Sequence, residues 1–349
     1  MGSSRLVRQI SLDVISRACL DFGRVQVVLQ NIRLSEEAHN NPVRMKPHPV
    51  NERRRVVCSL LALSALAPPA LRGATHAAVA GTVSTWPVLL FIPYGGSDLG
   101  FSEAAYRGYL QVRRSGYRIT VVRDADDLGA ARILTIIGRH YTAGVRGFIL
   151  AGAELSAVTA TAAAHYPQAY FATLSGTANG PNVVNFCLDC KSLGGALAGA
   201  VAANVSKTKT VGFVGGVESV DGTEAQSFRQ AVLAKVPDAT VLVDWVGDWD
   251  NRPRTQQLTG QQIDAGADVI VADANDSVIV AAARHPSVRV IGWMADASRR
   301  YGNVAASVII DTSVIFRRFV DGAVAGRFEG GDYTVVDADN VWKIVWPRG

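Results

Sequence analysis

From Trp86 onward the chain alternates short apolar runs with longer Ala-rich stretches. The apolar runs are nearly continuous, which is the pattern of strands buried on both faces of a parallel sheet. The predicted strands form two series, Val88–Ile92, Arg118–Arg123, Gly147–Leu150, Ala169–Leu174, Asn182–Phe186, and then Thr210–Val214, Thr240–Val246, Val269–Ala272 and Val288–Trp293. Predicted helices between them include Glu103–Arg114, Leu193–Val205, Gln226–Ala234 and Arg254–Ala265.

The strand series restarts after Phe186, which predicts an α/β fold of two doubly wound, Rossmann-like lobes of similar size. In such sheets ligands bind beyond the carboxyl ends of the strands, so the loops that follow strands are the candidate sites. These loops are Tyr94–Ser102, Ala151–Leu155, Ser175–Gly180, Gly215–Gly222, Gly247–Asn251, Asp273–Ser277 and Met294–Ser298.

Charge is distributed unevenly along the 349 residues, whose formal net charge is +5. Residues 1–80 hold 11 of the 35 Lys and Arg and 5 of the 30 Asp and Glu, so the remainder has 24 basic and 25 acidic side chains. A nucleic-acid-binding body would carry an excess of cations to displace phosphate counterions, and nucleic acid is therefore excluded as a partner. The 48% of hydrophobic residues also excludes a disordered chain.

The segment 45–80 has the layout of a secretory signal peptide. Basic residues precede the charge-free run Val56–Leu71, and Ala78–Ala80 fits a cleavage site that leaves Gly81 as the mature N-terminus. The alternative is a membrane anchor, but the run is shorter than the ~20 residues that span a bilayer and contains two prolines. Cys58 lies at the front of the run and makes no convincing lipobox. We therefore expect a periplasmic protein.

Residues 1–44 precede this signal. Because a secretory signal acts at an N-terminus, we interpret them as a gene-model extension, with translation beginning at Met45. A regulatory extension is the alternative.

Enzyme and metal signatures are missing from the sequence. It contains no G-x-G-x-x-G after a strand, no G-x-x-x-x-G-K-[ST], no H-E-x-x-H and no G-x-S-x-G, and the three histidines after residue 80 lack ligand-like spacing. We expect no catalysis, cofactor or metal. Cys187 and Cys190 form a C-x-x-C without the second pair that structural zinc needs, which leaves a small disulfide loop and two free thiols as alternatives.

Two aromatic residues follow strands of different lobes, Phe101 in the first and Trp249 in the second. Core packing would explain each of them, but together they would form a clamp for a flat ring. Asn275, Asp276 and Asp296 lie in two clusters of short polar side chains at strand ends. Such residues cap helices and turns, and they also supply hydrogen bonds to ligands.

Four strings together resemble the basic-membrane-protein (Bmp), purine-nucleoside-receptor family of ABC-transporter solute-binding proteins. They are residues 95–108 (GGSDLGFSEAAYRG), residues 181–203 (PNVVNF and LGGALAGAVAA), Lys209–Gly216 (KTVGFVGG) and Gly266–Val271 (GADVIV). The resemblance implies a type I periplasmic-binding fold with a three-segment hinge near Phe186, Asp296 and Gly326. The implied lobes are residues 81–186 plus 297–326, and residues 187–296 plus 327–349.

The resemblance also implies a function. Such a monomeric protein would bind a purine nucleobase or nucleoside between two stacking aromatics, here Phe101 and Trp249, and deliver it to a permease. The expected ligand-binding residues are Asp98, Phe101, Ser102, Trp249, Asn275, Asp276, Trp293, Asp296 and Phe316. The alternatives are a sensory or regulatory module of the same fold, or an enzyme on Rossmann-like lobes.

This sequence departs from the nucleoside receptors at four positions. Where the family places charged groups that serve a ribose, this chain has Pro93, Ser175, Met294 and Phe316. The loops after residues 244, 272 and 291 are closer to the adenine-binding-like branch. We therefore expect a bare nucleobase rather than its nucleoside.

Overall fold

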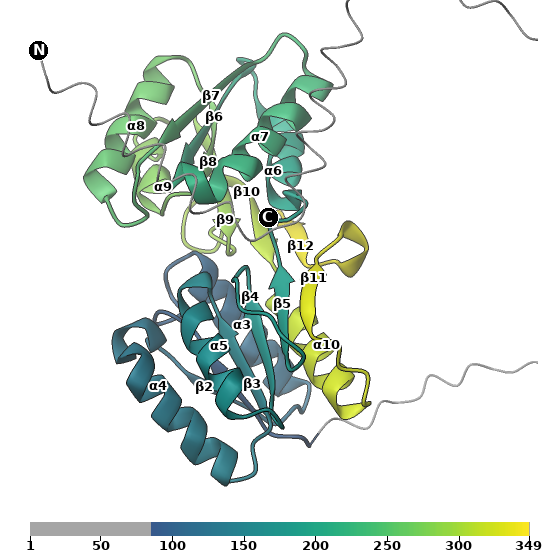
Figure 1. Ribbon diagram of the computed structural model, residues 1–349. Helices are drawn as coiled ribbons and strands as arrows, with labels where there is room; N and C mark the ends of the chain where they lie inside the picture. The colour runs from purple at the N-terminus through teal and green to yellow at the C-terminus, as the bar shows by residue number, and fades with distance from the viewer. Residues whose placement is uncertain (1–84, 349) are drawn as a thin grey trace, which may run out of the picture. The chain divides into compact units, whose positions relative to one another are not determined.

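The computed structural model describes residues 85–348, so the expectations for residues 1–44 and for the signal peptide at 45–80 lie outside it. The described part is an α/β fold built on two six-stranded sheets (Figure 1). The first sheet is wholly parallel, in the order β11-β5-β4-β3-β1-β2. Its strands are β1 (Val88–Phe91), β2 (Ile119–Val122), β3 (Gly147–Ala151), β4 (Tyr170–Leu174), β5 (Val183–Cys187) and β11 (Gly331–Thr334).

The second sheet has the order β12-β10-β9-β8-β6-β7 and is parallel except for the antiparallel pair of β10 and β12. Its strands are β6 (Thr210–Gly215), β7 (Thr240–Trp245), β8 (Val269–Ala272), β9 (Arg289–Met294), β10 (Val304–Ile310) and β12 (Trp342–Val345). The predicted fold of two doubly wound lobes is confirmed by this topology.

Helices cover both faces of each sheet, which is why central strands such as β1, β3 and β8 are apolar and buried along their whole length. In β1, Val88 and Leu90 point into one core cluster, while Leu89 and Phe91 point into the cluster on the other face. In the first lobe α3 (Phe101–Arg114) packs on α10 (Thr312–Val324), and α4 (Ala125–Thr142) packs on α5 (Ser156–His165). In the second lobe α6 (Leu193–Val205) packs on α7 (Glu218–Lys235), and α8 (Arg252–Asp264) on α9 (Ser277–Ala282). Two 3₁₀ turns, η1 (Ala153–Leu155) and η2 (Asp337–Asp339), lie between β3 and α5 and between β11 and β12.

The chain passes between the lobes three times, but two crossings lie elsewhere than expected. The first, between β5 and α6, agrees with the expected hinge near Phe186. The second follows Ile310 rather than Asp296, because β10 pairs with β9 in the second sheet. The third follows Thr334 rather than Gly326, because β11 pairs with β5 in the first sheet. The expected lobe boundaries at residues 297 and 327 are corrected accordingly.

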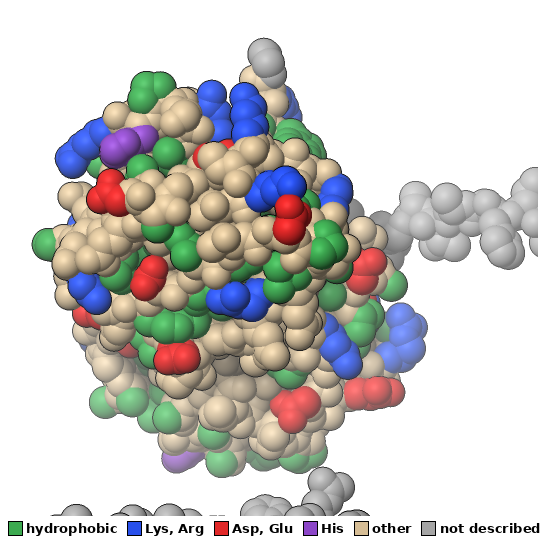
Figure 2. Space-filling view, turned by 90° about the horizontal axis from the view of Figure 1, so that it is seen from above, with side chains coloured by type: hydrophobic (Ala, Val, Ile, Leu, Met, Phe, Trp, Pro, Cys, Tyr) green, Lys and Arg blue, Asp and Glu red, His purple; other side chains and the backbone are tan. Residues whose placement is uncertain are grey.

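Acidic and basic side chains are interspersed over the surface that Figure 2 shows, which agrees with the near-neutral charge of the chain after residue 80. Within residues 85–348 no helix combines the length and the apolar character that crossing a bilayer requires.

Candidate functional site

The first-lobe candidates lie where the loop after β1 enters α3. The carboxylate of Asp98 accepts hydrogen bonds of 2.8–3.2 Å from three backbone N–H groups at the start of this helix. These are donors that a helix N-terminus leaves without an intrahelical partner. Ser102 is fully buried, and its Oγ accepts a hydrogen bond from the Tyr94 N–H at 3.3 Å. Asp98 and Ser102 therefore hold the loop against the helix that begins with Phe101, whose ring is half-buried against the core.

The second-lobe aromatic candidate, Trp249, lies in the loop between β7 and α8 with 42% of its surface exposed. Its indole packs over Gly216, at which any Cβ atom would collide with the ring. Asn275 Nδ2 donates to the Trp249 carbonyl oxygen at 2.7 Å and to Thr255 Oγ1 at 2.9 Å. Asn275 thus positions the loop that carries the indole. Among residues 85–348, no ring contact joins Trp249 to Phe101.

Two carboxylate candidates are already engaged by neighbouring side chains. Asp276 forms an ion pair with Arg252 at 2.6 Å. Asp296 accepts a hydrogen bond from Ser298 Oγ at 2.6 Å and lies 3.2 Å from Arg299 Nε. Both carboxylates therefore stabilise their own loops, as short acidic side chains at turns commonly do.

Two further candidates are core residues, which corrects their inclusion among the expected ligand contacts. Phe316 has no exposed surface, because its position on α10 points into the core with Ile315 and Phe319. Trp293 is buried in the second lobe, where its ring lies 6.0 Å from that of Phe213 and 5.6 Å from that of Trp342 between centroids. Phe316 therefore offers no surface to a ligand, and Trp293 is enclosed in the core, although its indole Nε1 has no hydrogen-bond partner there.

The fold brings together four carboxyl side chains that no sequence pattern singled out, which we call the carboxyl cluster: Asp189, Asp221, Glu224 and Asp273. Asp221 and Glu224 lie one turn apart on α7, Asp273 directly follows β8, and Asp189 lies in the crossing from β5 to α6. Asp221 and Asp273 hydrogen-bond to each other through their side chains, and Asp221 also contacts the Trp249 side chain. The one sequence signal was the polar segment after β8, from which we chose Asn275 and Asp276 instead of Asp273.

Each carboxyl of the cluster accepts a hydrogen bond from a neutral donor. The donors are Ser175 Oγ for Asp189 (2.8 Å), the Val217 N–H for Asp221 (3.2 Å), the Gly216 N–H for Asp273 (3.0 Å) and the Gly195 N–H for Glu224. None of the four forms an ion pair within the part of the chain that the structure describes. The cluster is therefore a buried acidic region without compensating positive charge.

Burial is the main cause that raises the pKa of each carboxyl in the cluster, because it penalises the charged form. The pKa of Glu224 rises to about 8, and the negative charges of Asp189 and Asp221 contribute to that rise. The pKa of Asp273 is raised well above its ordinary value by burial and by neighbouring Asp221. Glu224 therefore retains its proton at neutral pH.

Loops of the two lobes meet near the start of α3. Glu103 on α3 pairs with Arg300 of the second lobe at 3.0 Å, and Arg300 Nη1 also donates to the Ser97 carbonyl oxygen at 3.4 Å. Leu99, from the first-lobe loop, is buried among side chains of the second-lobe core, including Ala297. This contact places the loop after β1 against the loop after β9.

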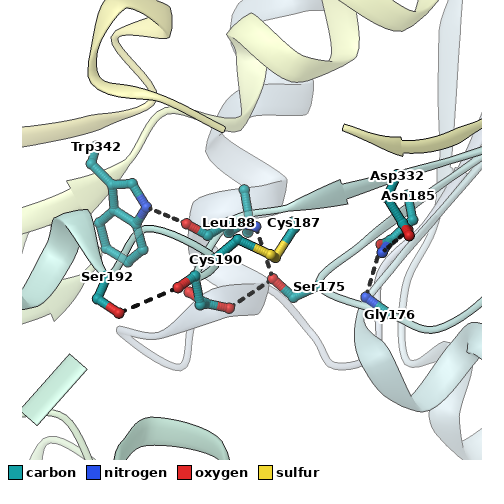
Figure 3. Close-up of a disulfide and its surroundings, with 10 residues drawn as sticks. Ser175, Gly176, Asn185, Cys187, Leu188, Cys190, Ser192, Asp332 and Trp342 are labelled. Atoms are coloured by element: carbon teal, nitrogen blue, oxygen red, sulfur yellow. Dashed lines mark hydrogen bonds between the residues drawn. A yellow bond between two sulfur atoms is a disulfide. The ribbon is translucent and has the colours of Figure 1, made fainter. Parts of the chain in front are cut away.

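The C-x-x-C pair is a disulfide, Cys187–Cys190, in the crossing from β5 to α6 (Figure 3). This settles the alternatives that the sequence left open. Hydrogen bonds tie this crossing to both lobes. The Leu188 carbonyl oxygen accepts from Trp342 Nε1 of the second lobe at 3.0 Å, and the Leu188 N–H donates to Ser175 Oγ of the first lobe at 3.3 Å. The disulfide loop therefore presents Asp189 to the carboxyl cluster from a restrained segment.

Comparison with known proteins identifies one family. Residues 87–341 match the family model Bmp, described as "ABC transporter substrate-binding protein PnrA-like". Among curated proteins, a "CD4+ T-cell-stimulating antigen" of Listeria monocytogenes is 38% identical over 79 residues, which are 22% of this chain and 22% of that protein. A protein of the same description from Listeria innocua matches equally. The chain thus spans about a fifth of the length of the curated relatives that it matches.

Solved structures share the fold at low identity. An ABC-transporter solute-binding protein from Conexibacter woesei superposes with a TM-score of 0.65 at 19% identity, covering 74% of this chain and 87% of that chain. A transcriptional activator of the comK gene from Bacillus halodurans gives 0.66 at 19%, covering 74% and 89%. A periplasmic solute-binding protein from Actinobacillus succinogenes with bound D-allose gives 0.56 at 14%, covering 75% and 98%. These likenesses show a type I periplasmic-binding fold.

Proposed function

We propose, from the premise that this chain belongs to the Bmp family of PnrA-like ABC transporter substrate-binding proteins, that it captures a purine nucleobase. Proteins of this family bind small molecules outside the cytoplasm and hand them to a membrane permease. The proposal concerns the ligand and the residues that hold it, at the loops where the two lobes meet.

The observation that carries this proposal is the half-exposed indole of Trp249 beside the carboxyl cluster. A flat aromatic ligand stacked on the indole gains about 0.5–1.5 kcal/mol beyond the burial of its area. The carboxyls of Asp221 and Asp273 then lie next to the ring and can accept hydrogen bonds from its edge. Phe101, at the start of α3, is the first-lobe residue that we propose to complete the stack.

The surroundings favour a base over a nucleoside. Pro93 is buried and, like Met294, has no side-chain hydrogen-bond donor, while Phe316 is enclosed in the core. Ser175 Oγ is already occupied, since it donates to Asp189 and accepts from the Leu188 N–H. A buried ribose hydroxyl without a partner costs roughly 1–3 kcal/mol.

Calorimetry on the chain beginning at Gly81 tests the proposal with adenine, adenosine, glucose and an amino acid. We expect adenine to bind at least tenfold more tightly than adenosine, a difference of about 1.4 kcal/mol. Trp249→Ala should weaken adenine binding far more than Ser175→Ala, because it removes the stacking surface. Trp346→Ala is the matched control, since Trp346 is 53% exposed and lies after β12. Tighter binding of adenosine, or indifference to loss of Trp249, would contradict the proposal.

We also propose that residues 45–80 direct export. Expressed from Met45 in a Gram-negative host, the protein should appear in the periplasm with its N-terminus at or near Gly81, as N-terminal sequencing would show. A soluble, folded product that retains Met45 would contradict the signal peptide.

A further inference from the structure

The feature that the proposed function leaves unexplained is the charge balance of the carboxyl cluster. Glu224, Asp221 and Asp273 have only 3%, 7% and 9% of their surfaces exposed. No ion pair offsets them within residues 85–348. Burying carboxyls without cations is costly, and proteins rarely do so without a partner for them.

One atom of the cluster has no partner at all. The Gly195 N–H donates to Glu224 Oε2, but Glu224 Oε1 is buried and forms no hydrogen bond. Unpaired buried polar atoms are rare in native proteins, because each loses its hydrogen bonds to water. A buried carboxyl oxygen without a hydrogen-bond partner indicates that a partner is supplied from outside the chain.

Within residues 85–348, the charged groups that shift the pKa values of the cluster are its own carboxyls. Asp189 faces it from the β5–α6 crossing, the Gly195 N–H from α6, and the Trp249 side chain from the β7–α8 loop. The exposed indole leaves an aromatic surface open beside the acceptors. An aromatic face next to carboxyls is suited to flat, nitrogen-rich rings that carry N–H donors.

We propose that the carboxyl cluster selects bases that present an exocyclic amino group, and that Asp273 and Asp221 are the specificity-determining residues. This inference rests on the proposed binding of purine bases. Adenine and 2,6-diaminopurine carry an amino group at C6, whose N–H groups donate to carboxyl oxygens. Hypoxanthine has a carbonyl oxygen there, which cannot donate a hydrogen bond to the carboxylate that an amino group would stabilise. A site built for a donor rejects a ligand that lacks it, because its polar groups are left unpaired.

Binding should also move protons. Burial keeps the proton on Glu224 at neutral pH, and hydrogen bonds from a ligand favour the ionised carboxylate. Adenine binding at pH 7 should therefore release protons to the buffer. Calorimetry in two buffers of different ionisation enthalpy measures this release directly.

The experiment measures adenine, 2,6-diaminopurine and hypoxanthine binding to the chain beginning at Gly81 and to two variants. In the parent protein both amino-purines should bind at least tenfold more tightly than hypoxanthine. Asp273→Asn replaces an acceptor by a side chain that also donates, and should reduce this preference to about threefold or less. Asp238→Asn is the matched control, because Asp238 is an exposed acidic residue of the second lobe that pairs with Lys209, and should keep the full preference.

The outcomes separate the two proposals. If hypoxanthine binds as tightly as adenine to the parent protein, or if no protons are released on adenine binding, this inference is overturned while purine binding stands. Neither of those measurements depends on the folding of a variant. If Asp273→Asn binds adenine but keeps the full preference, the assignment to Asp273 is overturned. If no base binds the parent protein, the proposed function fails and this inference fails with it.

Discussion

Glu103 in the first lobe and Glu224 in the second are the same residue type with the same exposure, 3%, yet their surroundings are opposite. Glu103 accepts a hydrogen bond from the Leu99 N–H at 3.0 Å and pairs with Arg107 at 2.6 Å and Arg300 at 3.0 Å. Glu224 receives one backbone N–H, and its second oxygen has no partner.

Glu103 and Glu224 differ in whether the protein itself supplies partners for the buried carboxyl. The protein itself satisfies Glu103, whose two guanidinium partners tie the start of α3 together and link it to the second lobe. Glu224 belongs to a cluster that the protein leaves incomplete, and its pKa is raised to about 8 in consequence of burial. Removing Glu103 would leave two charges unpaired and destabilise the fold, whereas we propose that a ligand completes the surroundings of Glu224.

The largest effect should come from Glu103→Ala. Removing a buried partner of two charges costs about 3–5 kcal/mol, and because both arginines are about 40% exposed we expect the lower end, about 3 kcal/mol. Urea unfolding monitored by circular dichroism measures the loss. The control is Asp238→Ala, which breaks an exposed pair and should leave the midpoint unchanged. Equal urea midpoints for Glu103→Ala and Asp238→Ala would contradict the claim that the buried Glu103 contributes more to stability than an exposed ion pair.

Glu224→Gln should have the opposite sign at alkaline pH. The folded state holds the Glu224 proton up to about pH 8, while the unfolded chain releases it near 4.5. The free energy of unfolding therefore falls as pH rises between these values, by at most about 1.4 kcal/mol per unit. A glutamine has no proton to lose, so the variant should be more stable than the parent at pH 9 and match it at pH 4. Parallel pH profiles would show that Glu224 titrates normally.

The disulfide should contribute a smaller amount, because it closes a loop of only four residues. The chain-entropy estimate for such a loop is about 2 kcal/mol, so the double variant Cys187→Ser, Cys190→Ser should lose about that much stability. Since Asp189 lies within this loop, the variant should also bind adenine more weakly. An unchanged adenine affinity would mean that the loop does not position the cluster.

The smallest effect on stability should come from Arg300→Ala, because half-exposed ion pairs contribute about 1 kcal/mol or less. Arg107→Ala is the matched control, since it removes the Glu103 partner that lies on the same helix. Of these two arginines, Arg300 is the one that joins the lobes, so its loss should weaken ligand binding several-fold while loss of Arg107 should not. If both variants bind adenine equally, the ion pair between the lobes has no part in binding.

Most of the fold could be predicted because buried parallel strands are continuous apolar runs. All nine expected strands are present among residues 85–348, but β10, β11 and β12 were not predicted. β11 (GDYT) is polar and lies at a sheet edge, where no apolar run is required, whereas β10 (VAASVII) is an apolar run that the two expected series left out. Helix α7 begins at Glu218, eight residues before the expected start, because its first turns are polar. The hinge could not be placed without knowing which sheet β10 and β11 join.

The candidate site could be predicted only to the level of loops. The polar segment after β8 contains two aspartates, and the sequence does not say which of them meets a cation. In the structure Asp276 reaches Arg252 across 24 residues, while Asp273 turns toward Asp221 across 52. Such choices depend on long-range packing, which is also why Trp293 and Phe316 could not be recognised as core residues.

The most direct test of the account is a carbon-13 NMR titration of the glutamate side-chain carboxyls, with and without adenine. The signal absent from Glu224→Gln identifies Glu224. We predict that the pKa of this carboxyl is about 8 in the free protein and falls when adenine is bound, because donated hydrogen bonds favour the ionised form. A Glu224 carboxyl that titrates near 4.5, or one whose pKa does not change in saturating adenine, would contradict the claim that a ligand completes this cluster.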